Sequence, residues 1–402
     1  MTTLPPDVYF KKIVTHDQTA PPLEFRTAQD LFSSHQVDVG SARLLRSLAE
    51  TALPSDAVLD VGCGYGPLGL TLKAAQPARH VHLVDRDALA LAYTRQNAAL
   101  NGLADVEVYG SLGYDAVIRR DFDLIISNIP GKAGDPVIES LLVDARHYLR
   151  PGGWVAVVVV APLAPLVDAV LAAAEAEIRH REVRSGHAIY HYGFAAAEPS
   201  ALPATGLERG LYHRDTVEIA TEDLAMTLET ARGLPEFDSL SYETRALFKL
   251  LDTADVPREA RVMGIHPGQG YVPVALWQRW TPARITLADR DLLSLHYAAR
   301  NLASNGCPPE RVTQVHCAGL TLDAPHAADL IAGVIRESEG EAAIAHTVQQ
   351  AAAHLAPGGQ MLLAGSSTAI TRIIKAVQAE KLLTVKKRKR ITGGKSALLL
   401  EN

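Results

Sequence analysis

The strongest constraint on the fold is that the chain repeats itself. Residues 58–102 match residues 262–306 without a gap, each pair being separated by 204 positions. Farther on, residues 151–153 match residues 357–359 at a separation of 206, so a two-residue insertion lies between the two blocks. Internal similarity at such a long period within 402 residues predicts two tandem domains of the same fold.

Each copy alternates apolar strand segments with helical segments, which predicts a mostly parallel α/β sheet with helices on both faces. The loop-like sequence EPSALPATG, residues 198–206, gives expected domains of 1–200 and 201–402. In the first copy, strands are expected near 57–61, 81–84, 106–109, 123–127 and 154–160, with a final hairpin after Glu182 that turns at Ser185-Gly186 and has a counterpart turning at Gly393-Gly394.

A glycine-rich loop follows the first of these strands, in the sequence VLDVGCGYGPLG from Val58 to Gly69. Its glycines, at positions 62, 64 and 66, allow positive φ and let the backbone approach a ligand closely. GYGPLG also fits the G-x-G-x-x-G of dinucleotide sites, and Asp85 follows Gly66 at nearly the spacing of a ribose-binding acid. The loop alone is therefore compatible with two classes of nucleotide ligand.

Asp60 favours one of these ligands. Its carboxylate lies two residues before Gly62. It would repel a pyrophosphate at the helix N-terminus, but it would attract a sulfonium and an α-ammonium group. The loop therefore favours the methyl donor S-adenosylmethionine over NAD.

A second candidate feature is the tetrapeptide Asn128-Ile129-Pro130-Gly131, where an apolar strand ends in a turn. The side-chain oxygen of Asn128 could accept a hydrogen bond from an amine, and a carbonyl on the Pro-stiffened turn could accept another. Two such acceptors would hold an amine for in-line attack, so catalysis would consist mainly of positioning. The alternative is that Ser127 and Asn128 only cap the turn through local hydrogen bonds.

The second copy differs at these positions. Gly264 replaces Asp60, His266 replaces Gly62, and residues 334–337 (VIRE) replace the tetrapeptide. We therefore expect this copy to have lost both sites and to serve as a scaffold or recognition domain. It keeps Asp289 and two loop glycines, which would still allow weak nucleotide binding.

Composition excludes several classes of protein. Three cysteines without metal-ligand spacing indicate a reducing compartment and no metal site. The amino terminus lacks the pattern of a signal peptide. The apolar run 154–174 contains Pro162, Pro165 and Asp168, so it is interpreted as a buried strand and helix and not as a membrane span. These features predict a cytoplasmic protein without membrane segments.

The densest charge run is KKRKR, residues 386–390, beside the predicted final hairpin. It could protect a sheet edge from strand-to-strand aggregation. It could instead contact RNA phosphates locally, although the formal net charge of the chain is -6.

The first copy resembles the class I methyltransferases. The whole chain is similar to the methyltransferase small-domain family, notably the ribosomal RNA guanine-N2 methyltransferases with two Rossmann-like domains. The motifs that carry this resemblance are FSSHQVDVGSARLL, VLDVGCGYGPLG, LVDRD, NAALNG, FDLIISNIP and LRPGG, in family order. The resemblance implies two Rossmann-like methyltransferase domains in tandem, each a mostly parallel seven-stranded sheet with a terminal antiparallel hairpin. It also implies S-adenosylmethionine as cofactor and ribosomal RNA as partner.

The resemblance also assigns roles to individual residues. The cofactor-binding set would be Asp60, Gly62, Cys63, Gly64, Gly66, Asp85, Ser111 and Leu112. The catalytic residues would be Asn128 and Pro130, and the substrate-binding residues Phe32, Ile129, Gly131 and Lys132. Residues 38–40 belong to the segment that closes over the donor in the family.

Two departures from the family pattern affect the substrate. The family has Asn-Pro-Pro followed by an aromatic residue that stacks on the target base, whereas Gly131 cannot stack. The related family members also keep the carboxy-terminal copy active, whereas here the amino-terminal copy carries the motifs. A protein or small-molecule acceptor, and a non-catalytic factor that binds the donor and RNA, are therefore kept as alternatives.

Overall fold

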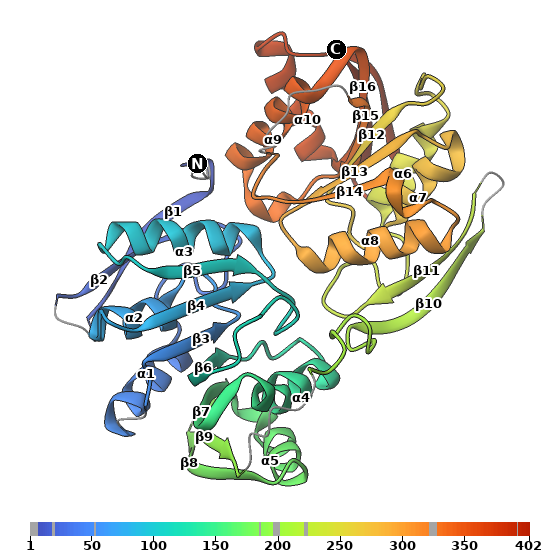
Figure 1. Cartoon of the computed structure of the whole chain (residues 1–402). Coiled ribbons are helices and arrows are strands. Elements are labelled where there is room, and N and C mark those ends of the chain that lie inside the picture. The colour runs from blue at the N-terminus through green and yellow to red at the C-terminus, as the bar shows by residue number, and fades with distance from the viewer. Residues whose placement is uncertain are drawn as a thin grey trace. The chain divides into compact units, whose positions relative to one another are not determined.

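The computed structural model describes residues 7–17, 21–51, 54–184, 186–195, 202–220, 224–320, 328–391 and 393–402 (Figure 1). These residues form two compact units. Unit 1 contains residues 10–212, and unit 2 contains residues 7–9 and 213–402.

Unit 1 begins with an antiparallel hairpin and continues as an alternating α/β domain. Its elements are β1 (Phe10–His16), β2 (Leu23–Ala28), α1 (Val39–Thr51), β3 (Ala57–Val61), α2 (Pro67–Ala75), β4 (His80–Asp85), α3 (Ala88–Leu100), β5 (Val106–Gly110), β6 (Phe122–Asn128), α4 (Asp135–Val143), η2 (Asp144–His147), β7 (Leu149–Val160), η3 (Ala161–Leu163), α5 (Ala164–Ala173), β8 (Ala176–Arg184) and β9 (His187–Phe194).

The described strands of unit 1 form a seven-stranded sheet in the order β5-β4-β3-β6-β7-β9-β8. The first four strand pairs are parallel, and β9 is antiparallel to both β7 and β8. Every residue of β3 is buried, as expected for a central parallel strand covered on both faces. The chain order reverses between β3 and β6, and the carboxyl ends of open α/β sheets carry ligand sites at such a point.

Unit 2 repeats this architecture. Its elements are η1 (Asp7–Tyr9), β10 (His213–Ala220), β11 (Ala225–Ala231), α6 (Tyr242–Leu251), β12 (Arg261–Ile265), α7 (Tyr271–Trp280), β13 (Arg284–Asp289), α8 (Leu292–Ser304), η4 (Pro309–Arg311), β14 (Val312–His316), β15 (Ala328–Val334), η5 (Glu337–Glu339), α9 (Glu341–His354), β16 (Leu355–Ser366), α10 (Ser367–Ala379), β17 (Thr384–Ile391) and β18 (Lys395–Glu401).

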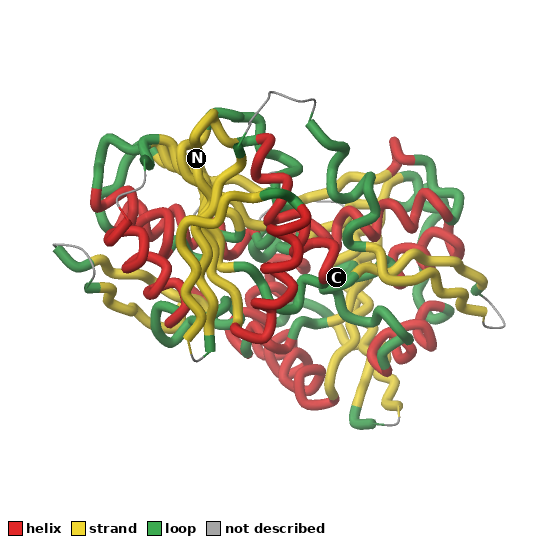
Figure 2. The backbone as a smooth tube through the Cα atoms, turned by 90° about the horizontal axis from the view of Figure 1, so that it is seen from below, coloured by secondary structure: helices red, strands yellow, loops and turns green. Residues whose placement is uncertain are grey.

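The sheet of unit 2, traced through its described strands, has the matching order β14-β13-β12-β15-β16-β18-β17. Figure 2 shows strands gathered into sheets, with helices beside them. The predicted fold class is therefore confirmed, including the antiparallel hairpin that ends each sheet. The last hairpin of unit 1 begins earlier than expected, at Ala176, while the predicted turn residue Ser185 lies outside the described residues.

The apolar run 154–174 forms the end of β7 and then α5, the expected strand and helix. Among the described residues, no helix combines the length and the apolarity needed to cross a membrane.

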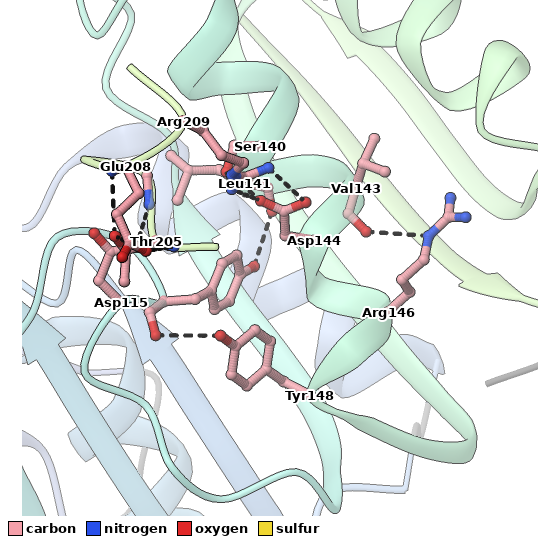
Figure 3. A network of polar contacts seen from close by, with 12 residues as sticks. Asp115, Ser140, Leu141, Val143, Asp144, Arg146, Tyr148, Thr205, Glu208 and Arg209 are labelled. Carbon is pink, nitrogen blue, oxygen red and sulfur yellow. Dashed lines mark hydrogen bonds and ion pairs between the residues drawn. The ribbon is translucent and has the colours of Figure 1, made fainter. Parts of the chain in front are cut away.

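The segment 202–212 binds unit 1 through a polar network (Figure 3). Arg209 forms an ion pair with the buried Asp144 and donates a hydrogen bond to Ser140 Oγ at 3.1 Å. The amide of Gly206 donates to Asp115 Oδ1 at 2.8 Å. The two compact units divide after residue 212, and the predicted domain boundary at residue 200 lies outside the described residues.

Candidate functional site

The glycine loop after β3 has the backbone that its sequence predicts. Gly62, Gly64 and Gly66 have φ values of 76°, 59° and 93°. A Cβ at Gly62 or Gly64 would meet no atom within 4 Å, whereas a Cβ at Gly66 would lie 2.7 Å from Leu70 Cδ1. The first two glycines therefore leave open space above the backbone, and the third is required by the packing of α2.

Asp60 lies under this loop with its side chain fully buried. Its Oδ2 accepts a hydrogen bond from the Gly69 amide at 2.8 Å. Its buried Oδ1 has no hydrogen-bond partner among the described residues. Burial raises the pKa of Asp60 to about 7, the Gly69 hydrogen bond opposes this rise, and the charge of Asp85 adds to it. A buried carboxylate oxygen without a partner is costly unless a cation or a donor completes it.

Asp85 ends β4 beside the loop and is held from both sides. Its Oδ2 accepts from the Gly64 amide at 2.8 Å, and its Oδ1 accepts from the Asp87 amide at 2.9 Å. Burial, followed by the charge of Asp87, raises the pKa of Asp85 to about 6. The carboxylate is thus fixed in place next to the open backbone of the loop.

Ser111 and Leu112 follow β5 and lie next to Asp85, because the Ser111 amide donates to the Asp85 carbonyl at 3.0 Å. The Ser111 hydroxyl donates to the Gly113 carbonyl and accepts from the Ala116 amide, so it holds its own loop. Leu112 is buried. Their predicted contact with an adenine remains a prediction.

Cys63 is buried in the loop, and burial, with the charges of Asp85 and Asp60, raises its pKa well above the ordinary thiol value. Its sulfur lies 3.7 Å from Thr94 Oγ1, and Thr94 also donates to the Gly64 carbonyl at 2.8 Å. This setting suits a small residue that packs a tight turn and does not favour a reactive thiolate.

Asn128 ends β6, and its side chain reaches toward α1. Its Nδ2 donates to Asp38 Oδ2 at 2.9 Å and to Ser41 Oγ at 2.9 Å. A carboxylate can only accept hydrogen bonds, so the amide nitrogen must face Asp38 and leaves Oδ1 of Asn128 for another donor. Asp38 is itself fixed, because the Ser41 amide donates to the same Oδ2 at 3.0 Å.

In the described part of the chain, the side chains of Ser127 and Asn128 form hydrogen bonds outside their own turn. The Ser127 hydroxyl donates to the Val61 carbonyl at 2.8 Å and ties β6 to β3. The Asn128 amide nitrogen bonds to α1 and its preceding loop, not to its own turn. Sequence reasoning placed Asp38 only in a segment near the donor and did not connect it to Asn128. The N-cap character of an Asp before an amphipathic helix was the signal available in the sequence.

The rest of the tetrapeptide forms a turn with an exposed face. Ile129 is buried and its amide donates to the Val158 carbonyl at 3.0 Å. The Pro130 carbonyl accepts from the Ala133 amide at 3.1 Å. Pro130, Gly131 and Lys132 are exposed. The turn therefore presents its outer surface next to Asn128 without an aromatic ring of its own.

Phe32 lies in the loop before α1 with 72% of its side chain exposed. The loop is pinned on two sides, since Thr27 Oγ1 donates to the Ser34 carbonyl at 2.8 Å and Tyr65 Oη lies 3.4 Å from the Ser33 carbonyl. The glycine loop, the Phe32 loop and Asn128 are thereby connected through Tyr65 and Asp38.

The corresponding region of unit 2 is occupied by its own side chains. Arg336 Nη2 donates to Asp289 Oδ1 at 2.8 Å, and Ser294 donates to Asp289 Oδ2 at 2.6 Å. Burial opposes ionisation of Asp289, but Arg336 and His266 outweigh it and lower the pKa of this carboxyl. His266 Nδ1 lies 3.1 Å from the Val334 carbonyl. The carboxylate that corresponds to Asp85 is therefore already neutralised.

Within the described ranges, no group of three or more His, Cys, Asp or Glu side chains is arranged to hold a metal ion.

Comparison with known proteins adds three findings. The model of the Methyltransferase small domain family matches residues 22–188. The uncharacterized protein YbxB of Bacillus subtilis is 32% identical over 136 residues, which cover 33% of this chain and 67% of YbxB. Ribosomal RNA small subunit methyltransferase C of Pseudomonas entomophila is 40% identical over 141 residues, which cover 34% of this chain and 41% of that enzyme.

A solved structure shares the fold of this chain. It is the T. thermophilus 16S rRNA N2 G1207 methyltransferase in complex with AdoMet and guanosine, with a TM-score of 0.66 and 17% identity. The similarity covers 98% of this chain and 99% of that one.

Proposed function

We propose, from the premise that the chain belongs to the methyltransferase small domain family, that unit 1 is an S-adenosylmethionine-dependent methyltransferase acting on an exocyclic base amine of RNA. This membership confirms the family that the sequence motifs predicted. The observation that carries the proposal is the orientation of the Asn128 amide by Asp38 and Ser41, at the same sheet edge as the glycine loop.

The residues present fit the donor. The unpartnered Oδ1 of Asp60 and the open backbone at Gly62 and Gly64 suit a ligand that carries positive charge and needs close approach. Asp85 is fixed where it can accept from the hydroxyls of a ribose. When bound, S-adenosylmethionine would supply an electrophilic methyl group.

Asn128 would hold the acceptor amine. Its Oδ1 can accept one N–H of the amine, and the Ile129 carbonyl can accept the other, since the Pro130 carbonyl is already bonded to Ala133. Two acceptors on one NH2 direct the nitrogen lone pair away from the protein backbone and toward the donor side of the site. The neutral amine attacks without a general base, and the methylated nitrogen then releases one proton to solvent, so positioning supplies most of the rate.

Three considerations support RNA as the acceptor. The P. entomophila relative is named as a ribosomal RNA methyltransferase, and the structural neighbour was solved with guanosine. The exposed ring of Phe32 could stack on a base in place of the aromatic missing at Gly131. A paired base would have to be flipped out to reach Asn128. We place this activity in the cytoplasm, where ribosomes are assembled and used.

We further propose two functional domains. Unit 1 would be catalytic, and unit 2 would serve recognition or support.

One donor molecule is expected to bind per chain, because the carboxylate of Asp289 already forms an ion pair with Arg336. Isothermal titration of the full chain with S-adenosylmethionine measures this stoichiometry. Two sites of similar affinity would contradict the proposed loss of the site in unit 2.

The function is tested by transfer of labelled methyl to total RNA, ribosomal particles and protein from cells that lack the gene, with nucleoside analysis. Label in one N-methylated nucleoside of ribosomal RNA is the expected result. Label found only in protein or small molecules would show that RNA is not the acceptor, while the assignment as a methyltransferase would stand. Donor binding without any transfer would favour a non-catalytic factor that binds the donor and RNA.

A further inference from the structure

The edge strand β17 of unit 2 carries an excess of unpaired positive charge. Residues 386–390 are consecutive cations, and all except Arg388 are exposed. Lys386 pairs with Glu401 at 2.8 Å, and Arg388 donates to Ser367 and Thr371. Among the described residues, none of Lys387, Lys389 and Arg390 has a carboxylate within ion-pair distance.

The equivalent edge strand of unit 1 shows that edge protection does not require this excess. β8 occupies the same place in its sheet as β17 does in the other. Its three arginines are paired with carboxylates. The pairs are Arg179 with Glu177, Arg181 with Asp168, and Arg184 with Glu182. Balanced charges therefore suffice to discourage strand pairing at β8, and the unbalanced charge of β17 calls for another explanation.

A groove adjoins one face of β17. It has a volume of about 1030 Å³ and is lined by residues of the β10–β11 hairpin, α6 and β17. Lys389 and Ile391 line it, and strand alternation places Lys387 on the same face. The ring of Tyr242, 57% exposed, also lines the groove, and a Cβ at Gly393 would lie 3.7 Å from this ring. An exposed aromatic ring thus lies beside the turn that follows the cationic strand.

The charges of the groove are also biased toward positive. Two of its acidic residues are neutralised, since Asp252 pairs with Arg279 and Asp238 pairs with Arg214. The unneutralised charges that line it are those of the cations Arg245, Lys249 and Lys389 and of one acid, Glu218. A local excess of cations in a chain of net charge -6 favours a polyanionic partner at this place.

We propose that this groove binds a single-stranded segment of RNA, with phosphates along Lys387 and Lys389 and one base stacked on Tyr242. Cations that follow the backbone, combined with an aromatic platform, form the usual site for unpaired nucleic acid. Strands rise about 3.3 Å per residue, so Lys387 and Lys389 lie about 7 Å apart along the same face of the strand. The inference rests on the proposed function for RNA as the partner, and it assigns unit 2 the role of holding that RNA.

The test measures binding of a fluorescein-labelled 12-nucleotide oligouridylate to the full chain by anisotropy, between 50 and 200 mM KCl. In the variant Lys387→Gln/Lys389→Gln, the slope of log K against log salt should fall in magnitude by about 1.4, or about 0.7 for each phosphate that the variant no longer neutralises. Tyr242→Leu should weaken binding about 5- to 150-fold with the slope unchanged. The matched control Arg179→Gln/Arg184→Gln removes the same charge from β8 and should leave the slope as in wild type.

An unchanged slope in the lysine variant, or an equal change in the β8 control, would overturn the assignment of this groove. If Tyr242→Leu binds the oligouridylate as tightly as wild type, the proposal that a base stacks on Tyr242 is wrong. The methyl-transfer assay is independent of these readouts. If the wild-type chain methylates RNA but the lysine variant has the wild-type salt slope, the proposed function stands. Only the assignment of RNA binding to this groove is then wrong. Transfer confined to protein, together with no RNA binding, would remove both.

Discussion

Asn128→Ala is expected to lower methyl transfer by about 100- to 1000-fold, the range found when one preorganised hydrogen-bonding group is removed from an active site. The substitution deletes the oxygen proposed to hold the acceptor amine, and it leaves the hydrogen bonds of Asp60 and Asp85 intact. Donor affinity, measured by calorimetry, should therefore stay within about a factor of two. The rate is measured by single-turnover kinetics with the unmethylated form of the RNA that the labelling assay identifies as the acceptor. Normal turnover would remove Asn128 from the mechanism.

Asp38 provides the companion variants for this prediction. Asp38→Ala removes the acceptor that fixes Asn128 Nδ2, so the amide can rotate and present its nitrogen to the amine. Asp38→Asn keeps an oxygen at that place. We expect kcat to fall in the alanine variant and to recover substantially in the asparagine variant, with the KM for the donor nearly constant. Equal loss in both variants would contradict this positioning role, because Asn at position 38 keeps an oxygen that can accept from Asn128 and can also cap α1.

Asn128 could be predicted as a site residue from its sequence motif, whereas its contact with Asp38 could not. Local conformation could be predicted, because positive φ at Gly62, Gly64 and Gly66 is dictated by the residue type. The alternation of strands and helices, doubled by the repeat, predicted a mostly parallel sheet in both units, whereas the strand order came from the structure. The hydrogen bond between Asp38 and Asn128 joins residues 90 positions apart, and no periodicity encodes such a pair.

Two other features were beyond the sequence for the same reason. The substitutions in the second copy indicated a lost site, but only the structure shows Arg336 bonded to Asp289. Residues 202–206 belong to the loop-like sequence 198–206, yet the adjoining Arg209 holds this segment to the rest of unit 1 through the buried Asp144. In both cases a long side chain bonds to a residue that is distant in the sequence. The amino-acid composition shows only that the side chain is polar, not which residue it contacts.

Asp60→Asn is expected to weaken S-adenosylmethionine binding about 10- to 100-fold at pH 8, the order of magnitude of a lost hydrogen bond to a charged group. The physical reason is that the ionised carboxylate attracts the positive charge of the donor. The pKa of Asp60 is about 7 in the free protein, so wild-type affinity should fall as pH drops below 7. Calorimetry from pH 5.5 to 8.5 measures how donor affinity depends on pH. In the Asp60→Asn variant, only the pH dependence that comes from ionisation of Asp85 should remain.

The same substitution should raise the free energy of unfolding of unit 1 at high pH. An unfolded Asp ionises near pH 3.9, whereas folded Asp60 keeps its proton until about pH 7. Between these values the folded state binds more protons, so stability falls as pH rises, by at most about 4 kcal/mol in total. Asn cannot ionise, so the variant should be the more stable protein at pH 8 and similar to wild type near pH 4.

Hydrogen exchange of the β3 and β6 amides, compared between wild type and variant at each pH, measures the stability of unit 1 separately from that of unit 2.

Asp289→Asn is the matched control. Arg336 lowers the pKa of that carboxyl, so its stabilising effect is present above the unfolded pKa and is lost as pH falls through the folded one. Its removal should destabilise unit 2 at pH 8 without changing donor affinity. An Asp60→Asn variant that loses the donor without gaining stability at pH 8 would mean that Asp60 ionises in the folded free protein near the ordinary pKa of an Asp. The burial of its unpartnered oxygen would then be compensated by water, and the donor would displace that water on binding.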